Sequence, residues 1–375
     1  MKKNLLIISL IMSAELCATA FGCSDAETDD TADSGTDGDT DGDSDGDTDE
    51  KVNIVWKNNG LFHWNGKKIT PITGTSSDAS TYSISGKYIV WEKYISSTPN
   101  VADIYLWDGS TSTKIISDGA RNALPFKGDG LYNNNFVWGS NKGGQEDLYF
   151  WNGSAKSRIT NDAALETNFC FHKGKAAWSK DDGNDNEIYF WDGSNIVQVT
   201  DNAFDDGDRH GSLKISDNYL VWIGSTAGDK LKLFYWDGSK VGEITEWSKY
   251  DQLDFSVSGH NVTWAAKVGN VTEIFFWNGS TVTQITHDSS HYNQSPRISG
   301  NNIIWVSGGL FFWDGTKTTQ ITDKSPQNFD HQISGNNVVW GGNDGNDVEI
   351  YFWDGKTITK VTENETDDIY PKISL

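Results

Sequence analysis

One short motif recurs eight times along the chain and restricts what the chain can fold into. In each copy an aromatic run ends in Trp and is followed by Asp-Gly or Asn-Gly, as in EIYFWDGS at residues 187–194. The Trp of the copies stands at Trp64, Trp107, Trp151, Trp191, Trp236, Trp277, Trp313 and Trp353, with spacings of 36 to 45 residues. A period near forty residues is typical of β-propeller blades.

Three further pieces recur around each motif. A second Trp precedes it, usually at the end of an apolar run, at Trp56, Trp91, Trp138, Trp178, Trp222, Trp264, Trp305 and Trp340. An ISG-like segment lies upstream and a TQIT-like segment follows, so each repeat predicts four strands. The Asp-Gly and Asn-Gly pairs predict type I′ hairpin turns between strands three and four, with φ > 0 at both central residues.

The two ends of the repeat region complement each other. Residues 51–56 read as a second strand without a first, and residues 369–375 read as a first strand without a second. Pairing them completes one blade and closes a ring, which removes an exposed sheet edge. We therefore expect an all-β fold over residues 51–375, an eight-bladed β-propeller of four-stranded antiparallel blades.

Residues 1–22 resemble an export signal. Two Lys residues precede an apolar run at residues 5–12, which is too short to span a membrane. Cys23 follows Ala20-Phe21-Gly22, which resembles a bacterial lipobox and predicts lipidation of Cys23; cleavage after Ala20 is the alternative. We expect an outer-membrane or cell-surface lipoprotein held by its lipid anchor only, or otherwise a periplasmic or secreted protein.

Residues 23–50 differ sharply in composition from the repeat region. They contain 13 Asp or Glu residues and no Lys or Arg, which predicts a disordered acidic spacer. Residues 51–375 still carry a net charge of −11 and only four Arg residues, so we expect no nucleic-acid partner. Cys170 has no Cys partner within the repeats, and packing must supply the stability.

The motifs carry a family resemblance. The order of ISG, an IVW-like strand, a D-G-N loop, EIYFWDG and QIT resembles the TolB-type, WD-like propeller repeats, which are also seen in dipeptidyl-peptidase-type propellers. The resemblance covers residues 51–375 and implies the propeller fold. TolB-like proteins carry a separate α/β domain before the propeller, where this chain has its acidic spacer.

Variable loops indicate where a ligand would bind. Loops between strands two and three, and between a fourth strand and the next first strand, share one face and vary in length, as binding loops on rigid scaffolds do. An insertion after Trp191 gathers polar residues, and the next two such loops gather aromatic and His residues. The candidate ligand-binding residues are Asp205, Asp206, Asp208, Arg209 and His210, together with Trp247, Tyr250, His287, His291 and Tyr292.

Two loops between strands two and three carry carboxylates at short intervals, DDGNDNE at residues 181–187 and NDGNDVE at residues 343–349. Such oxygen ligands suit calcium. The candidate calcium ligands are Asp181, Asp185 and Glu187 in the first loop and Asp344, Asp347 and Glu349 in the second. Solvated turns are the other interpretation of these loops, and no other cofactor is expected.

No catalytic motif is present: the chain has no G-x-S-x-G, H-E-x-x-H or phosphate-loop sequence. We therefore favour a non-catalytic, monomeric binding module that engages a protein or glycan through its variable face. A polysaccharide-active enzyme is the alternative, because relatives of TolB-like propellers act on uronates with His, Arg and a metal. A basic, His-rich lining of the central channel would distinguish it. A purely structural repeat protein is a third interpretation.

Overall fold

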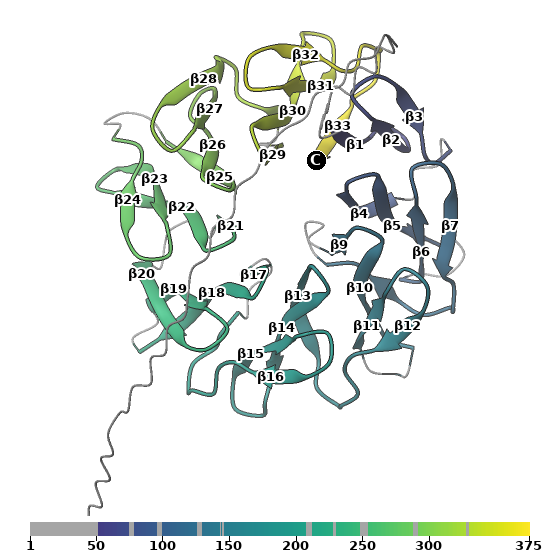
Figure 1. Ribbon diagram of the computed structural model, residues 1–375, viewed down its shortest axis with the longest axis vertical. Helices are drawn as coiled ribbons and strands as arrows, with labels where there is room; N and C mark the ends of the chain where they lie inside the picture. The colour runs from purple at the N-terminus through teal and green to yellow at the C-terminus, as the bar shows by residue number, and fades with distance from the viewer. Residues whose placement is uncertain are drawn as a thin grey trace, which may run out of the picture. The chain divides into compact units, whose positions relative to one another are not determined.

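The structure is a computed structural model. It describes residues 52–74, 79–95, 100–125, 130–142, 144, 146–207, 212–227, 230–247, 254–287, 292–327 and 330–375. Eight antiparallel sheets follow one another around a central axis, as Figure 1 shows, which confirms the eight-bladed all-β propeller. No helix in this part of the chain is long and apolar enough to cross a membrane.

Blades 1 to 4 occupy the first half of the ring. Blade 1 contains β1 (Asn53–Lys57), β2 (Leu61–Trp64), β3 (Ile69–Pro71) and, from the far end of the chain, β33 (Ile369–Ser374). Blade 2 contains β4 (Ala79–Ser85), β5 (Tyr88–Tyr94), β6 (Ala102–Trp107) and β7 (Ser112–Ile116). Blade 3 contains β8 (Asn122–Ala123), β9 (Leu131–Tyr132), β10 (Asn135–Ser140), β11 (Asp147–Trp151) and β12 (Lys156–Arg158); β8 and β9 both pair with β10. Blade 4 contains β13 (Glu166–His172), β14 (Lys175–Asp181), β15 (Asn186–Trp191) and β16 (Ile196–Gln198).

Blades 5 to 8 complete the ring. Blade 5 contains β17 (Leu213–Ser216), β18 (Tyr219–Thr226), β19 (Lys230–Trp236) and β20 (Val241–Trp247). Blade 6 contains β21 (Phe255–Ser258), β22 (Asn261–Val268), β23 (Val271–Trp277) and β24 (Val282–Gln284). Blade 7 contains β25 (Gln294–Ser299), β26 (Asn302–Val306), β27 (Leu310–Trp313) and β28 (Thr318–Thr322), and blade 8 contains β29 (His331–Ser334), β30 (Asn337–Asn343), β31 (Val348–Trp353) and β32 (Ile358–Lys360).

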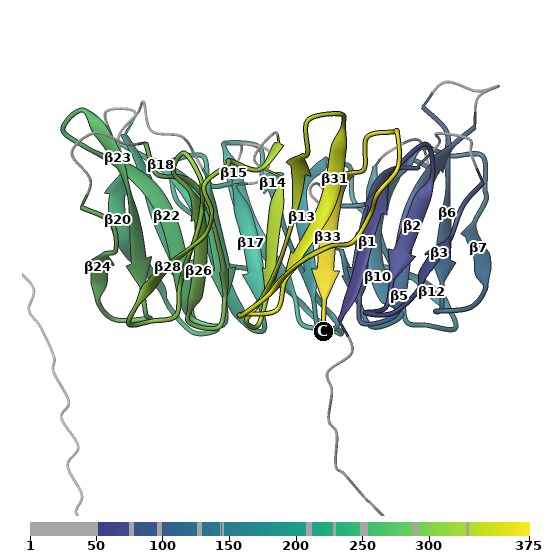
Figure 2. The same ribbon diagram turned by 90° about the horizontal axis from the view of Figure 1, so that it is seen from above.

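The ring closes through the two ends of the repeat region. Strand β33 pairs antiparallel with β1, with Asn53 opposite Ser374 and Ile54 opposite Ile373. In Figure 2 the two strands stand side by side although they come from opposite ends of the colour scale. The pairing of residues 369–375 with the first blade is thereby confirmed.

The core lies between neighbouring blades. Strand-two Trp residues are almost fully buried, and Trp222, with no exposed surface, packs in a cluster that joins apolar residues of blades 4 and 5. The strand-two Trp residues also stack on aromatic residues of strand three. Trp178, for example, stacks on Tyr189 with ring centroids 6.1 Å apart. Each sheet is covered on both faces, so its second strand contains a continuous buried run, as at residues 303–306 of β26, instead of a strict alternation.

At five junctions between described residues, the serine of an ISG-like segment joins one blade to the next. The Ser hydroxyl of one blade accepts a hydrogen bond from the backbone amide in the first turn of the next blade. Ser258 Oγ, for example, accepts from the Gly300 amide at 2.8 Å, and Ser299 Oγ accepts from the Gly335 amide at 2.9 Å. The amide residue adopts a left-handed conformation, with φ of 59° at both Gly300 and Gly335, which favours glycine there.

The turns between strands three and four differ from the expectation. Only the Gly of each Asp-Gly or Asn-Gly pair has φ > 0, as at Gly193 with φ of 104°, whereas the preceding Asp or Asn is not among the residues with positive φ. The type I′ prediction was therefore wrong. Asp192 instead uses its side chain: Oδ1 accepts hydrogen bonds from the amides of Ser194 and Asn195, each at 2.7 Å. This Asx-type bond competes with the backbone geometry that a type I′ turn requires.

Candidate functional site: the central channel

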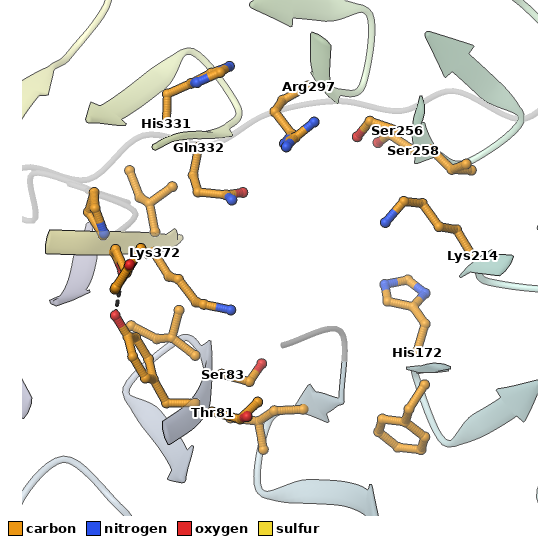
Figure 3. A pocket seen from close by; sticks show the side chains of 18 of the residues that line it. Thr81, Ser83, His172, Lys214, Ser256, Ser258, Arg297, His331, Gln332 and Lys372 are labelled. Carbon is orange, nitrogen blue, oxygen red and sulfur yellow. Dashed lines mark hydrogen bonds between the residues drawn. The ribbon is translucent and has the colours of Figure 1, made fainter. Parts of the chain in front are cut away.

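The first strands of the blades line a cavity of about 740 Å³ at the centre of the ring. Six of these strands place residues at the same register, each opposite the middle of its second strand; they are Ser83, Lys214, Ser256, Arg297, Gln332 and Lys372. In Figure 3 the side chains of Lys214, Gln332 and Lys372 extend toward the middle of the cavity from separate strands. We call these six residues the channel ring.

The charge of the lining contrasts with the charge of the chain. Three cations, Lys214, Arg297 and Lys372, face the cavity, against two carboxylates, Asp254 and Asp330. Residues 51–375 as a whole carry a net charge of −11. A cationic lining inside a concave site focuses the potential there and attracts anionic groups.

The cations of the channel ring are held in place by their neighbours. Arg297 Nη1 donates to both carboxylate oxygens of Asp254 at 3.0 Å and to the Pro296 carbonyl at 2.9 Å. The Lys372 ammonium lies 5.4 Å from the ring centroid of Tyr82. Such contacts orient the long side chains and lower the entropic cost of binding a ligand.

Asp330 makes the charge of the lining depend on pH. Burial raises its pKa to about 7, even though the Tyr370 amide, Lys372 and Arg297 act in the opposite direction. Near neutral pH the carboxyl group therefore exists in both protonation states. Its protonation removes one of the two negative charges and makes the cavity more cationic.

Two histidines line the channel, and one nitrogen of each is already engaged. His172 Nδ1 accepts a hydrogen bond from the Asp217 amide at 2.8 Å, where other blades use the ISG serine, so the neutral ring carries its proton on Nε2. His331 is buried, and its Nε2 lies 2.8 Å from the Ser295 carbonyl, which can only accept, so Nε2 is the donor. His172 Nδ1 and His331 Nε2 therefore each hydrogen-bond to the backbone of a neighbouring blade and help to hold the blades together.

The acidic insertion after blade 4 is only partly described. Asp206 is buried and uses both carboxylate oxygens, accepting from Trp222 Nε1 at 2.8 Å and from Asn202 Nδ2 at 2.7 Å. Asp205 accepts a hydrogen bond from the Asn186 amide at 3.1 Å. These two residues therefore stabilise the junction of blades 4 and 5. Asp208, Arg209 and His210 lie outside the described residues, and a ligand role for the group stays a prediction.

The aromatic and His cluster of the next loops is likewise described only in part. His287 is exposed, and Tyr292 is exposed over 61% of its surface. The backbone of Trp247 ends β20, opposite Leu231, but the position of its side chain lies outside the description. Tyr250, His291 and the lipidation candidate Cys23 also lie outside the described residues.

The two carboxylate loops each bring three acidic side chains together. Asp344, Asp347 and Glu349, the candidate calcium ligands of the second loop, place carboxylate oxygens within 4.8 Å of one another, and their role as ligands stays a prediction. In the other loop Asp182 takes the place expected for Asp181, and it lies with Asp185 and Glu187 within the same distance. Asp181 instead closes the turn by accepting from the Gly183 amide at 2.7 Å.

The channel ring was not predicted from the sequence, although a signal was present. Each member stands two residues before the serine of the ISG segment, as in KIS at residues 214–216, RIS at 297–299 and KIS at 372–374. Aligning the repeats on that serine would have shown a column with three cations in an acidic protein.

Comparison with known proteins supports the fold alone. No family model matches the sequence, and no curated protein matches it. A solved structure of a puromycin hydrolase matches 79% of this chain and 55% of its own, with a TM-score of 0.51 and 11% identity. An acylaminoacyl peptidase from Pyrococcus horikoshii matches 76% of this chain and 52% of its own, with a TM-score of 0.50 and 12% identity. The chain thus spans about half the length of these two proteins.

TolB proteins are also among the similar structures. TolB from Acinetobacter baumannii matches 62% of this chain and 62% of its own, with a TM-score of 0.37 and 17% identity. The matches to the puromycin hydrolase and the acylaminoacyl peptidase, with TM-scores of 0.51 and 0.50, show a shared propeller architecture, and a propeller hosts many unrelated functions. The function must therefore be argued from the site.

Proposed function

We propose that this protein is a non-catalytic binding module that receives an anionic group of a protein or glycan ligand in its central channel. The observation that supports this most is the set of three cations, Lys214, Arg297 and Lys372, on one ring of the cavity. The neutral members of the ring, Ser83, Ser256 and Gln332, add hydrogen-bonding groups between the charges. A concave site with a few convergent polar groups is the usual form of a ligand pocket.

The variable loops extend the proposed site. The connections from one blade to the next enter the inner strands that line the channel, as the loop before β21 does at Asp254 and the loop before β29 does at Asp330. A ligand anchored in the channel would reach these loops. The exposed candidates His287 and Tyr292 would then contact its outer part, and Trp247, Tyr250 and His291 stay candidates from the sequence.

A polysaccharide-active enzyme is the second candidate, and the basic lining with two histidines favours it. A lyase needs a base that can accept a proton from the sugar. His172 is poorly suited, because its Nδ1 accepts from the Asp217 amide and Nε2 of the neutral ring is a donor. His331 is poorly suited because only 1% of its surface is exposed and its Nε2 donates to the Ser295 carbonyl. The lining thus supports recognition of an anion more strongly than proton abstraction.

The test is a titration of the intact protein with an oligouronate, an acidic peptide and an uncharged oligosaccharide of matched length. We expect at least one anionic ligand to bind, with affinity that falls as salt rises. Lys214→Gln and Lys372→Gln should each weaken that binding by about tenfold. Lys240→Gln is the matched control, because Lys240 is exposed in a turn between strands three and four.

The outcomes separate the candidates. Binding that is unchanged in both channel variants would refute the channel as the site. Binding that is lost only in Trp247→Ala would move the site to the variable loops. Appearance of an unsaturated sugar product during incubation with the oligouronate, read by ultraviolet absorbance, would favour the enzyme.

We further propose that the protein is exported and tethered to the cell envelope by a lipid on Cys23. The lipobox-like residues 20–23 support this, and the acidic residues up to 50 would separate the propeller from the membrane. Labelling cells with a fatty acid should mark the wild-type protein. Cys23→Ala should abolish the label and release the protein into the soluble fraction, and an unlabelled wild-type protein would favour cleavage after Ala20.

A further inference from the structure

Two hairpins contain carboxylate oxygens that are buried without a hydrogen-bond donor. In blade 8, Asp347 is only 8% exposed, and both of its carboxylate oxygens are buried without a hydrogen-bond partner. In blade 4, both oxygens of the half-buried Asp185 and Oε2 of the fully buried Glu187 likewise have no partner, whereas Glu187 Oε1 accepts from the Asn202 amide at 2.6 Å. A buried carboxylate without a partner is costly, which indicates that a cation is the missing partner.

In each hairpin the oxygens of three carboxylates lie close enough together to contact one ion. Oxygens of Asp182, Asp185 and Glu187 lie within 4.8 Å of one another, as do those of Asp344, Asp347 and Glu349. The turns are also alike: Asp182 Oδ1 accepts from the amides of Asn184 and Asp185, and Asp344 Oδ1 accepts from those of Asn346 and Asp347. Local backbone bonds therefore hold the carboxylates of Asp182 and Asp344 at the same place in the two turns.

Three other blades place a basic residue on strand four beside the acidic residue at the start of strand three, whereas in blade 6 Glu273 accepts hydrogen bonds from Thr286 and Asn293. Asp103 pairs with Lys114 at 2.8 Å in blade 2, and Asp147 pairs with Arg158 in blade 3. In blade 8 the corresponding Lys360 lies 2.9 Å from Asp344 and 3.7 Å from Glu349. In these three blades the chain supplies its own cation.

Blade 4 lacks this cation. The residue opposite Tyr189 on strand four is Gln198, where Lys360 stands opposite Tyr351 in blade 8. Within the described parts of the chain, no basic side chain forms an ion pair with Asp182, Asp185 or Glu187. Lys180 stands opposite Glu187 on the neighbouring strand, but its ammonium pairs with Asp162 at 3.0 Å, so the three carboxylates have no ion-pair partner among the described residues.

We propose that the hairpin of blade 4 binds a calcium ion through Asp182, Asp185 and Glu187, and that the hairpin of blade 8 binds a second one more weakly through Asp344, Asp347 and Glu349. The ligands are all oxygens, with no His or Cys among them, which suits a hard cation. Calcium tolerates irregular sets of carboxylate ligands completed by water, whereas magnesium requires near-octahedral geometry. Lys360 weakens the second site because its positive charge pairs with Asp344 and Glu349 and repels a calcium ion bound there.

Thermal unfolding and calorimetric titration of the intact protein with calcium chloride test the proposal. Calcium should raise the melting temperature of the wild type by about 2 to 4 °C. Asp185→Asn should weaken binding at the stronger site by about 10- to 100-fold, and Asp347→Asn should do the same at the weaker site. The double variant should lose the thermal shift.

Two controls distinguish calcium binding at these two hairpins from non-specific attraction of calcium to a negatively charged protein. Asp192→Asn and Asp354→Asn remove one charge from the same blades at the turn between strands three and four, where Asn152 and Asn278 occur in blades 3 and 6. The calcium response of both should match that of the wild type. Calcium taken up by the acidic residues 25–50 is the same in every variant and cancels in the comparison.

Exchanging the residues on strand four gives a test that does not depend on removing a carboxylate. Gln198→Lys should abolish the stronger site and raise the melting temperature in the absence of calcium. Lys360→Gln should strengthen binding at blade 8 by about tenfold. An unchanged thermal shift in the Asp185, Asp347 double variant, the absence of any shift at millimolar calcium, or unaltered affinities in both exchanges would each overturn the proposal.

Discussion

The indole Nε1 of Trp56 donates a hydrogen bond of 2.7 Å to the carboxylate of Asp368, which lies 312 residues later in the chain. The other oxygen of Asp368 accepts from Asn364 Nδ2 at 2.6 Å. Asp206 makes the same two bonds, to Trp222 and Asn202, inside the ring. The same Trp–Asp–Asn hydrogen bonds therefore join blades 4 and 5 and also join blade 8 to blade 1, where the ring closes.

Removal of this closing bond should destabilise the protein. Asp368→Ala leaves the buried Trp56 indole without an acceptor, and we expect the free energy of unfolding to fall by about 2 kcal/mol. Chemical denaturation would measure the change. Glu365→Ala, at an exposed position nearby, is the control and should have little effect. Equal stabilities of the two variants would show that the bond contributes nothing to closure.

Deletion of residues 370–375 removes most of β33 and reopens the ring. The deleted segment pairs with β1 at Asn53, Ile54 and Val55 and supplies Lys372 to the channel. We expect the free energy of unfolding to fall by more than about 3 kcal/mol, because a buried strand and its apolar contacts are lost together. A melting temperature equal to that of the full chain would argue against closure by these two strands.

Asp330 should make stability depend on pH. Its pKa is about 7 in the folded protein and 3.8 in an ordinary environment, so the folded state retains a proton that the unfolded state releases. The free energy of unfolding should therefore decrease as pH rises from about 4 to 7. Melting curves across this range should show a smaller decrease for Asp330→Asn. Parallel curves for the variant and the wild type would show that Asp330 titrates normally.

In the turn between strands three and four of blade 4, we expect Asp192→Asn and Asp192→Ala to affect stability differently. Asp192→Asn keeps an oxygen that can accept from the amides of Ser194 and Asn195, so the melting temperature should not change. Asp192→Ala removes that acceptor and should lower the melting temperature by about 2 °C. Differential scanning calorimetry of the two variants would detect the difference. Equal values would mean that the turn does not need the side chain.

The repeat pattern is sufficient to specify the architecture. Sixteen of the 17 Trp residues fall into two columns with a period near forty, and both ends of the repeat region supply complementary strands. Each blade is specified by short-range pattern, so these signals are readable along the chain. The hairpin turns were predicted in place but not in type, because the side chain of residues such as Asp192 competes with the backbone for the turn amides.

The sites, in contrast, depend on how the blades assemble into the ring. Lys214 and Lys372 lie far apart in the sequence, and closure of the ring makes them line one cavity. Asp206 looked like a free ligand residue in the sequence, but the neighbouring blade brings Trp222 to it. The physical reason is that a blade buries its faces against its neighbours. What each polar residue contacts depends on the blade beside it, which local sequence does not specify.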